Sequence, residues 1–269
     1  MNNDLVPDDL WERIAPLIPA RPPRRRRFPG RKPVDDRTAL AGIVYVLRKG
    51  VSWADVPPER IGCSGITCWR RLRDWTEAGV WPRLHEALLL ELRRVDLLDM
   101  DDCSIDGSHV RALKGGPNTG PSPVDRSRPG SKHHVIVDRH GTPLAVSLTG
   151  GNRHDVTQLI PLLDAIPRIR GRRGRPRHKP KRLYADRGYD FRKYRRLLWA
   201  RGIVPKIAQR GAPHGSGLGK TRWVVERTFA WLHQFKRLRI RYEIRADLHE
   251  GLLQLACVII CLRRLRTAF

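Results

Sequence analysis

Three acidic residues occupy positions from which carboxylates could act on a phosphate group. Asp106 lies in a short β-rich run, Asp186 directly follows another, and Glu226 lies within a helical pattern. Carboxylates on two strand ends and one helix can jointly hold two divalent cations about 3.5–4 Å apart, which clamp the attacking and leaving oxygens of an in-line phosphoryl displacement. Because these ligands are hard oxygens without Cys or His, they favour Mg²⁺, with Mn²⁺ as a substitute, over zinc.

Each of these acids also has an ordinary structural interpretation. An Asp before Gly is most often a turn residue, and a Glu followed by Arg is most often half of a surface ion pair. At 100° per residue, one face of the helix around Glu226 carries Arg222, Glu226, Ala230, His233 and Arg237. A carboxylate among cationic and hydrogen-bonding groups suits a position beside a phosphate. The joint arrangement, rather than any single acid, therefore carries the prediction.

The elements that must position these acids follow a mixed α/β pattern from about residue 97 onward. We expect strands over 104–110, 133–137, 143–148, 181–185 and 203–207, and helices over 155–166, 191–201, 222–238 and 248–265. The Gly/Pro-rich segment 114–128 predicts a mobile loop near Asp106. In the turn 150–155, Asp155 is expected to cap the next helix; the alternative is a helix N-terminus beside the DNA backbone.

The first 96 residues are predicted to form short helices, over 8–17, 35–49, from Ser64 onward, and 81–95. The helix from Ser64 turns one face inward, Ile66, Trp69, Leu72 and Trp75, and presents Arg70, Arg71 and Arg73 on the other. Short helices, a Gly-containing turn and a basic-faced helix indicate a helix-turn-helix-like DNA-binding module. The alternative is a small helical bundle whose arginines are merely solvated. Residues 20–33 form a Pro/Arg arm containing Arg24, Arg25, Arg26 and Arg27.

The charge of the chain points to nucleic acid. Lys and Arg number 53 against 27 Asp and Glu, a net charge of +26, which favours binding to phosphates. Residues 97–269 account for +21 of it, and segment 168–182 alone holds nine Lys and Arg without an acid, which predicts a solvated loop. Within it, Arg173 and Arg175 flank Gly174 as in a minor-groove-binding AT-hook; a sequence-neutral phosphate contact is the alternative.

Other classes of protein fit the sequence poorly. The longest nearly uncharged apolar run, Gly251–Leu262, is about half of the roughly 20 residues that a membrane helix needs. The N-terminus lacks the pattern of a secretory signal, and five cysteines do not form a disulfide framework. We therefore expect a folded, cytosolic, DNA-binding protein with no membrane partner.

Over nearly its whole length the sequence resembles the DDE transposases of bacterial insertion sequences, in the group named after insertion sequence five. The N-terminal match includes Leu10-Trp11-Glu12, Leu40–Gly50, Trp53 and Trp69–Trp81. The family's three catalytic acids match Asp106 in Ile105-Asp106-Gly107-Ser108, Asp186 in Tyr184-Ala185-Asp186-Arg187-Gly188-Tyr189 and Glu226 in Arg222-Trp223-Val224-Val225-Glu226-Arg227. Gly219 and His233 depart from the Tyr and the Lys or Arg of the broader superfamily, whereas Arg222 is retained. Phosphate contacts are therefore expected from Arg222, with His233, Lys236 and Arg237 as substitutes.

The resemblance implies a ribonuclease-H-like mixed sheet with flanking helices over residues 97–269, preceded by an all-α DNA-binding domain over residues 1–96. It implies cut-and-paste transposition, in which Asp106, Asp186 and Glu226 hold Mg²⁺ ions while the DNA is cleaved and joined to a target. It also implies that the N-terminal helices and Arg24–Arg27 bind terminal inverted repeats, with a homodimer on double-stranded DNA at the bacterial nucleoid. Two alternatives remain: a metal-dependent endonuclease without strand transfer, and a non-catalytic DNA-binding protein such as a decayed transposase acting as a repressor.

Overall fold

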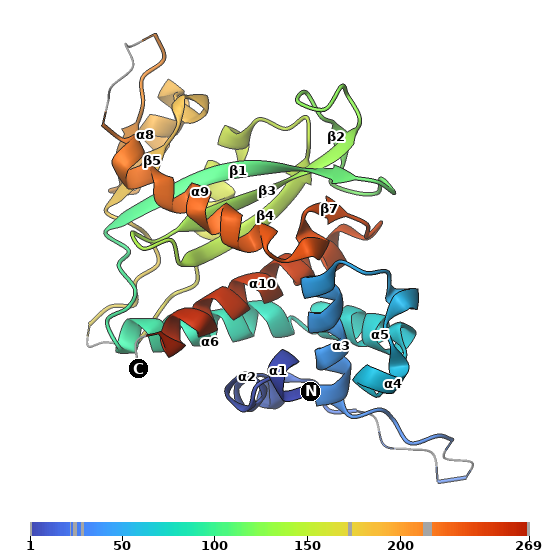
Figure 1. Ribbon diagram of the computed structural model, residues 1–269. Coiled ribbons are helices and arrows are strands. Elements are labelled where there is room, and N and C mark those ends of the chain that lie inside the picture. The colour runs from blue at the N-terminus through green and yellow to red at the C-terminus, as the bar shows by residue number, and fades with distance from the viewer. Residues whose placement is uncertain are drawn as a thin grey trace.

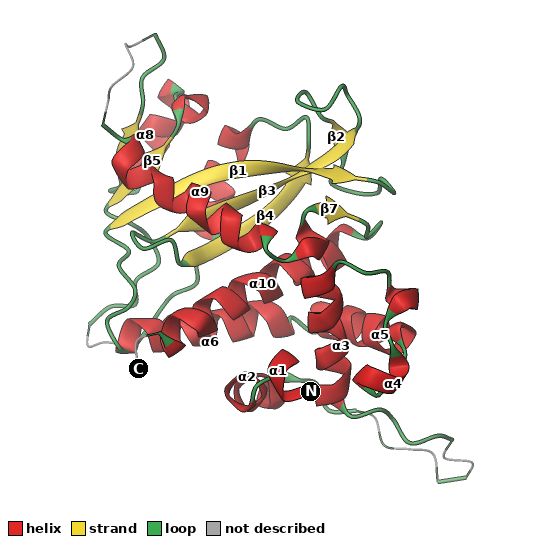
Figure 2. Cartoon of the chain, in the orientation of Figure 1, coloured by secondary structure: helices red, strands yellow, loops and turns green. Residues whose placement is uncertain are grey.

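The computed structural model, which describes residues 2–21, 23, 26–27, 30–171, 174–211 and 217–267, combines a mixed β-sheet with a layer of helices (Figure 1). Figure 2 shows the strands gathered in the upper part of the view and the N-terminal helices in the lower part. Three of the predicted DNA-binding residues, Arg24, Arg25 and Arg173, lie outside the described residues.

The N-terminal part is helical, as the apolar periodicity predicts. It contains α1 (Asn2–Leu5), α2 (Asp8–Ile14), α3 (Asp36–Lys49), α4 (Pro58–Ile61), α5 (Gly65–Glu77) and α6 (Val80–Arg94). At the start of α3 the Asp35 side chain accepts a hydrogen bond from the Thr38 backbone N–H, and Gly50 ends the helix with a φ of 73°, a conformation that favours glycine. Ser64 caps α5 by accepting from the Thr67 N–H. The predicted range of the first of these helices and the predicted start of the second are confirmed.

The inward face of α5 differs from the prediction at one position. Leu72 and Trp75 are buried, whereas Ile66 is 55% exposed. Cys68 faces α3 instead: a Cβ at Gly42 of α3 would lie only 2.2 Å from Cys68 Sγ. The connection between α3 and α5, residues 50–64, contains a 3₁₀ turn and α4, so it is longer than the three- or four-residue turn of a simple helix-turn-helix.

The sheet has the mixed order expected of the ribonuclease-H-like fold. Its strands are β1 (Asp102–Ala112), β2 (Gly120–Pro121), β3 (Pro129–Val137), β4 (Pro143–Gly150), β5 (Arg182–Ala185), β6 (Val204–Ile207) and β7 (Ile240–Arg241). β4, β3 and β1 are antiparallel neighbours, and β5 and β6 continue the sheet parallel to β1. The two-residue strands β2 and β7 were not predicted, and β2 lies within the segment expected to be a mobile loop.

The remaining helices are α7 (Leu159–Asp164), α8 (Arg192–Ala200), α9 (Gly219–His233) and α10 (Ala246–Arg266). Figure 1 shows α9 crossing the face of the sheet and α10 running alongside α6. Gly251 permits a close approach of α10 to α5 and α6, because a Cβ there would lie 2.7 Å from Thr76 Oγ1 on α5 and 3.2 Å from the Trp81 ring on α6. One continuous buried core includes residues from both predicted domains, so the predicted boundary at residue 96 runs through a shared interior. No helix among the described residues is long and apolar enough to span a membrane.

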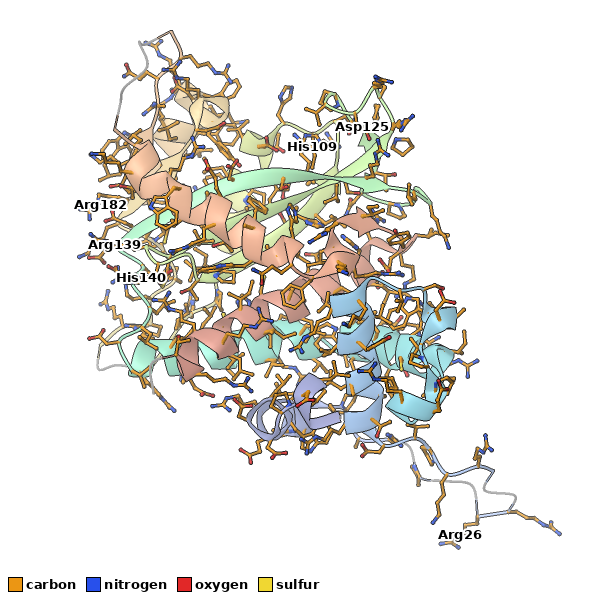
Figure 3. The ribbon with its side chains drawn as sticks, in the orientation of Figure 1. Arg26, His109, Asp125, Arg139, His140 and Arg182 are labelled. Atoms are coloured by element: carbon orange, nitrogen blue, oxygen red, sulfur yellow. The ribbon has the colours of Figure 1, made fainter. Side chains whose placement is uncertain are left out.

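Acidic residues at the start of β1 hold part of the basic segment 168–182. Arg177 and Lys181 form ion pairs with Asp101, and Arg182 pairs with Asp102. Arg139, 3.9 Å from Asp102, lies at the same end of the sheet as Arg182 (Figure 3). The prediction of a wholly solvated loop is therefore wrong for the end of this segment.

Candidate active site

Asp106 lies on β1, and Asp186 directly follows β5, the parallel neighbour of β1. The parallel register pairs Asp102 of β1 with Arg182 of β5 and Ser104 with Tyr184, an offset of 80 residues. The pairing ends at Ser104 and Tyr184, two residues before each acid. The sequence spacing of the two acids therefore equals the register between the two strands.

The edge of β1 beside Asp106 is open. β5 pairs with β1 only as far as Ser104, and β7 joins the same strand again at Arg111. Between these points no strand in the described part of the chain covers that edge. After β5 the chain turns sharply: Asp186 Oδ1 accepts a hydrogen bond from the Gly188 N–H at 2.9 Å, which begins a 3₁₀ turn over Arg187–Tyr189. The two acids thus border a gap in the sheet.

Burial raises the pKa of the Asp106 carboxyl to about 6. A hydrogen bond from the Gly107 N–H to Oδ1, 2.8 Å long, and the charge of Arg222 lower this pKa, whereas the charges of Asp186 and Asp155 raise it further. The charges of two other carboxylates and one guanidinium therefore act on Asp106. A half-buried carboxyl surrounded by like charges is typical of functional sites.

Glu226 and Arg222 lie one helical turn apart on α9. Arg222 Nη2 donates a hydrogen bond to Glu226 Oε1 at 3.0 Å, and the Glu226 side chain is 61% exposed. The charge of Arg222 also lowers the pKa of Asp106. The same guanidinium therefore interacts electrostatically with an acid of the helix and with an acid of the sheet. Glu226 is thus on the helix that faces the site, with its carboxylate engaged by Arg222.

The structure does not place Arg237 on the face of Arg222 and Glu226. α9 ends at His233, and residues 236–238 form a 3₁₀ turn, so the helical periodicity used to predict this face does not reach Arg237. Its buried guanidinium donates to Glu243 Oε1 at 2.7 Å and to the Val51 carbonyl at 2.9 Å. Arg237 therefore joins parts of the interior and is not available to a phosphate. His233 is half-buried in the last turn of α9, and burial lowers the pKa of its imidazole.

The other predicted DNA-binding residues differ in how accessible they are. Five of them are exposed: Arg26, Arg27, Arg70, Arg175 and Lys236. Figure 3 shows that Arg26 lies away from the helices. Arg71 and Arg73 are half-buried and paired, with Asp36 at 3.1 Å and Asp74 at 2.7 Å. The five exposed side chains are accessible to a phosphate, whereas Arg71 and Arg73 form ion pairs with neighbouring acids.

Asp155 and Tyr189 lie at the site but were not predicted to belong to it. The sequence suggested that Asp155 caps a helix, but His154 occupies the N-cap of the 3₁₀ turn 155–158, and no side chain caps it. Asp155 Oδ1 instead accepts from Lys132 Nζ at 3.0 Å. Tyr189 ends the turn after Asp186 and is 1% exposed. The sequence signal for Tyr189 was its position three residues after Asp186, and for Asp155 its place in the turn 150–155 after a strand.

The donor chemistry of the site fits a hard divalent cation. Asp106 and Asp186 are neighbouring carboxylates, and such oxygens are the ligands that Mg²⁺ and Mn²⁺ prefer. Among the described residues, no three His, Cys, Asp or Glu side chains are close enough together to hold an ion as they stand. Asp106 and Asp186 offer such oxygens, and Glu226 is paired with Arg222.

Family comparisons cover most of the chain. Residues 98–261 match the family described as "Transposase DDE domain", and residues 6–85 match "Putative transposase of IS4/5 family". A putative transposase of insertion sequence element IS402 from Burkholderia cepacia is 63% identical over 57% of this chain and 73% of its own length. A transposase of element IS1106 from Neisseria meningitidis serogroup B is 31% identical over 42% of this chain and 39% of its own length.

Solved structures are more distant. The Mos1 mariner paired-end complex with Mn aligns over 91% of this chain and 82% of its own, with 12% identity and a TM-score of 0.33. This similarity is too weak to support an argument about the fold, which is assigned from the strand order alone. The match across the catalytic half, together with the close relative in IS402, shows that the chain belongs to the DDE transposases of insertion sequences, in the IS4/5 family.

Proposed function

We propose that this transposase cuts and joins DNA at the gap beside β1, with Asp106, Asp186 and Glu226 as ligands of Mg²⁺ and Arg222 as a phosphate contact. The observation that supports the proposal is the parallel β1–β5 register, whose offset of 80 residues equals the sequence spacing of Asp106 and Asp186. When bound, two such ions would stabilise the charge on the attacking and leaving oxygens of an in-line displacement.

The residues of the site would each have a separate role at the scissile phosphate. Asp106 and Asp186 hold negative charge at the open edge of the strand, and Arg222 offers donors to a phosphate oxygen once Glu226 turns toward the acids. In the first step a water oxygen bonds to phosphorus as the bond to the 3′ oxygen breaks, which leaves a 3′-OH. In the second step that hydroxyl bonds to a target phosphorus and releases a new 3′-OH.

The basic, exposed residues would bind the DNA. We assign the terminal inverted repeats to the N-terminal helices and to the arm with Arg26 and Arg27, and the flanking phosphates to Lys236 and Arg175. Two element ends must be held together for joining, so a homodimer on DNA is the working assembly. Such contacts make affinity fall steeply as salt rises.

Purified protein, Mg²⁺ and a labelled DNA that carries the element's own ends test the proposal. We expect cleavage at the ends and covalent joining to a target, both abolished in Asp106→Asn and Asp186→Asn. Cleavage without joining would indicate a nuclease, and DNA binding without cleavage a non-catalytic binder. If Asp186→Asn cleaved normally, the assignment of the site would be wrong. Asp164→Asn is a matched control, because this surface acid pairs only loosely with Arg201 at 3.6 Å.

A further inference from the structure

The outer surface of α8 carries cations that are not engaged by any acid. Arg192, Lys193 and Arg196 are exposed, and none of them forms an ion pair or a side-chain hydrogen bond within the part of the chain that the structure describes. Arg195 on the same helix differs, because its Nε donates to Asp190 Oδ1 at 2.7 Å. α8 therefore has one arginine that holds the fold and three cations that are available to a ligand.

These cations share one face of the helix with an exposed aromatic ring. At 3.6 residues per turn, Arg192, Arg196 and Trp199 lie within about 60° of one another around the axis, and Lys193 borders them. The opposite side of the helix carries Leu198, which is buried. Trp199 is 57% exposed. The face thus combines positive charge with a flat apolar ring, two features with which proteins contact a nucleic-acid strand.

The same charges are unfavourable for α8 as a helix. Arg192 and Lys193 lie in its first turn, where the helix dipole favours acids over cations. Arg192 and Arg196 are four residues apart, and like charges at this spacing repel each other. From residue 191 to residue 202 the sequence contains no Asp or Glu that could offset them. A negatively charged ligand would do so, and residues that conflict with local preferences are expected at functional sites.

The position of α8 indicates which part of a DNA substrate it could contact. It begins six residues after Asp186 and connects the parallel strands β5 and β6. A helix that connects two parallel strands runs back along them, so its first turn lies toward the end of β5 that Asp186 follows. Figure 1 shows α8 at one end of the molecule and α3, α4 and α5 at the other, with the sheet between them. DNA on α8 would therefore be distant from DNA on the N-terminal helices.

We propose that the exposed face of α8 binds the phosphate backbone of the duplex that flanks the element, beyond the scissile phosphate. This inference rests on the proposed function, because it needs the element end on the N-terminal helices and its terminal phosphate at the acids of the sheet. The duplex then continues past Asp186 to Arg192, and Arg196 follows about 6 Å further along the helix. The face thereby distinguishes an element end that is still joined to flanking DNA from one that has been cut.

Binding of two DNA duplexes to the full-length protein tests this assignment without catalysis. One duplex stops at the terminus of the element, and the other continues for two helical turns of flanking DNA, about 20 base pairs. Filter binding in EDTA at several salt concentrations gives the slope of log affinity against log salt for each duplex. We expect the wild-type slope to be steeper for the flanked duplex by about 2.7, which is about 0.9 for each of three phosphate contacts.

A double substitution on α8 should reduce this difference in slope. We expect Arg192→Gln/Arg196→Gln to reduce it by about 1.8, for two lost contacts, and to bind the unflanked duplex as the wild type does. Arg126→Gln/Arg128→Gln is the matched control, because it removes two exposed arginines beside Asp125, on the side of the sheet away from α8 (Figures 1 and 3). An unchanged difference in slope, or an equal loss on both duplexes, would overturn the inference.

Thermal unfolding separates a binding role from a structural one. Since Arg192→Gln/Arg196→Gln removes repulsion within α8, this variant should unfold at the wild-type temperature or above it. A lower unfolding temperature together with unchanged slopes would show that the two arginines serve the fold, and the inference would be wrong.

Failure of the proposed function gives other results. Normal cleavage by Asp106→Asn and Asp186→Asn would overturn the catalytic site, although the slopes are measured without cleavage. Equal binding of the unflanked element end and an unrelated duplex would overturn the assignment of the N-terminal helices. The role of α8 is overturned separately, by a wild-type slope that does not change when flanking DNA is added.

Discussion

Arg222 Nη2 lies 3.0 Å from Glu226 Oε1 on α9, and the charge of the same guanidinium acts on the half-buried carboxyl of Asp106. An exposed i,i+4 pair of this kind stabilises a helix by only about 0.3–0.5 kcal/mol. The pair therefore contributes little to the stability of the fold.

Replacing Arg222 should separate activity from stability. We expect Arg222→Gln to change the free energy of unfolding by less than about 0.5 kcal/mol and to slow DNA cleavage about 10²–10³-fold, the usual loss when a donor to developing charge is removed. Urea unfolding and single-turnover cleavage of labelled DNA measure the two effects. Arg201→Gln, which breaks a surface pair with Asp164, is the control; equal cleavage by both variants would rule out a phosphate contact by Arg222.

The DNA-binding face of α5 can be tested with two neighbouring arginines. Arg70 is exposed, whereas Arg73 is paired with Asp74 at 2.7 Å and lies over the Trp69 ring. If Arg70 contacts a phosphate, Arg70→Gln should reduce the slope of log affinity against log salt by about 0.9. Arg73→Gln should leave this slope unchanged. A filter-binding series over several salt concentrations measures both, and equal slopes for the wild type and Arg70→Gln would exclude the contact.

Structural features that depend on nearby residues, or on a repeating pattern of residue types, could be predicted from the sequence. The strand patterns around Asp106 and Asp186 could be recognised, and their spacing of 80 residues proves to be the β1–β5 register. The caps Asp35 and Ser64 and the terminator Gly50 also fix their helix ends through hydrogen bonds or backbone angles within a few residues. Such features do not depend on the rest of the chain.

Interactions between distant elements could not be predicted in the same way. Asp155 looks like a helix cap locally, and only Lys132 on β3 and Gly107 on β1 determine where its side chain goes. Arg237 fits the helical face of Glu226 until α9 ends at His233 and the chain turns toward Glu243. In both cases a partner from outside the local pattern decides the role.

The buried pair of Arg237 and Glu243 should contribute stability that depends on pH. Burial opposes ionisation of Glu243, but the hydrogen bond from His249 and the charge of Arg237 outweigh it and lower its pKa to about 2. Since the folded protein holds this carboxyl ionised below its ordinary pKa of 4.5, the contribution is complete above about pH 4.5. It is lost as the pH falls from about 4.5 toward about 2.

Glu243→Gln tests this contribution directly. Removing one partner of a buried ion pair leaves the other charge unpaired, so we expect a loss of about 3–5 kcal/mol at pH 7. Urea unfolding at several pH values should also show a weaker dependence on acid than in the wild type. Glu91→Gln, which removes a partly exposed partner of Arg13, should cost no more than about 1 kcal/mol. Similar losses in the two variants would contradict the structural role of Glu243.

We expect the Tyr189 hydroxyl to speed DNA cleavage and to lower the stability of the folded chain. Its buried hydroxyl has no hydrogen-bond partner among the described residues, so Tyr189→Phe should raise the free energy of unfolding by about 1 kcal/mol in the absence of metal. If the hydroxyl donates to a cation-bound water or a phosphate, the same variant should cleave DNA about tenfold more slowly, since one hydrogen bond of about 1.4 kcal/mol equals a factor of ten. Thermal unfolding and single-turnover cleavage measure the two changes. Tyr194→Phe on α8, whose ring packs edge-on against Phe191, serves as control; a Tyr189→Phe protein that is less stable and fully active would show that the hydroxyl has a partner in the fold.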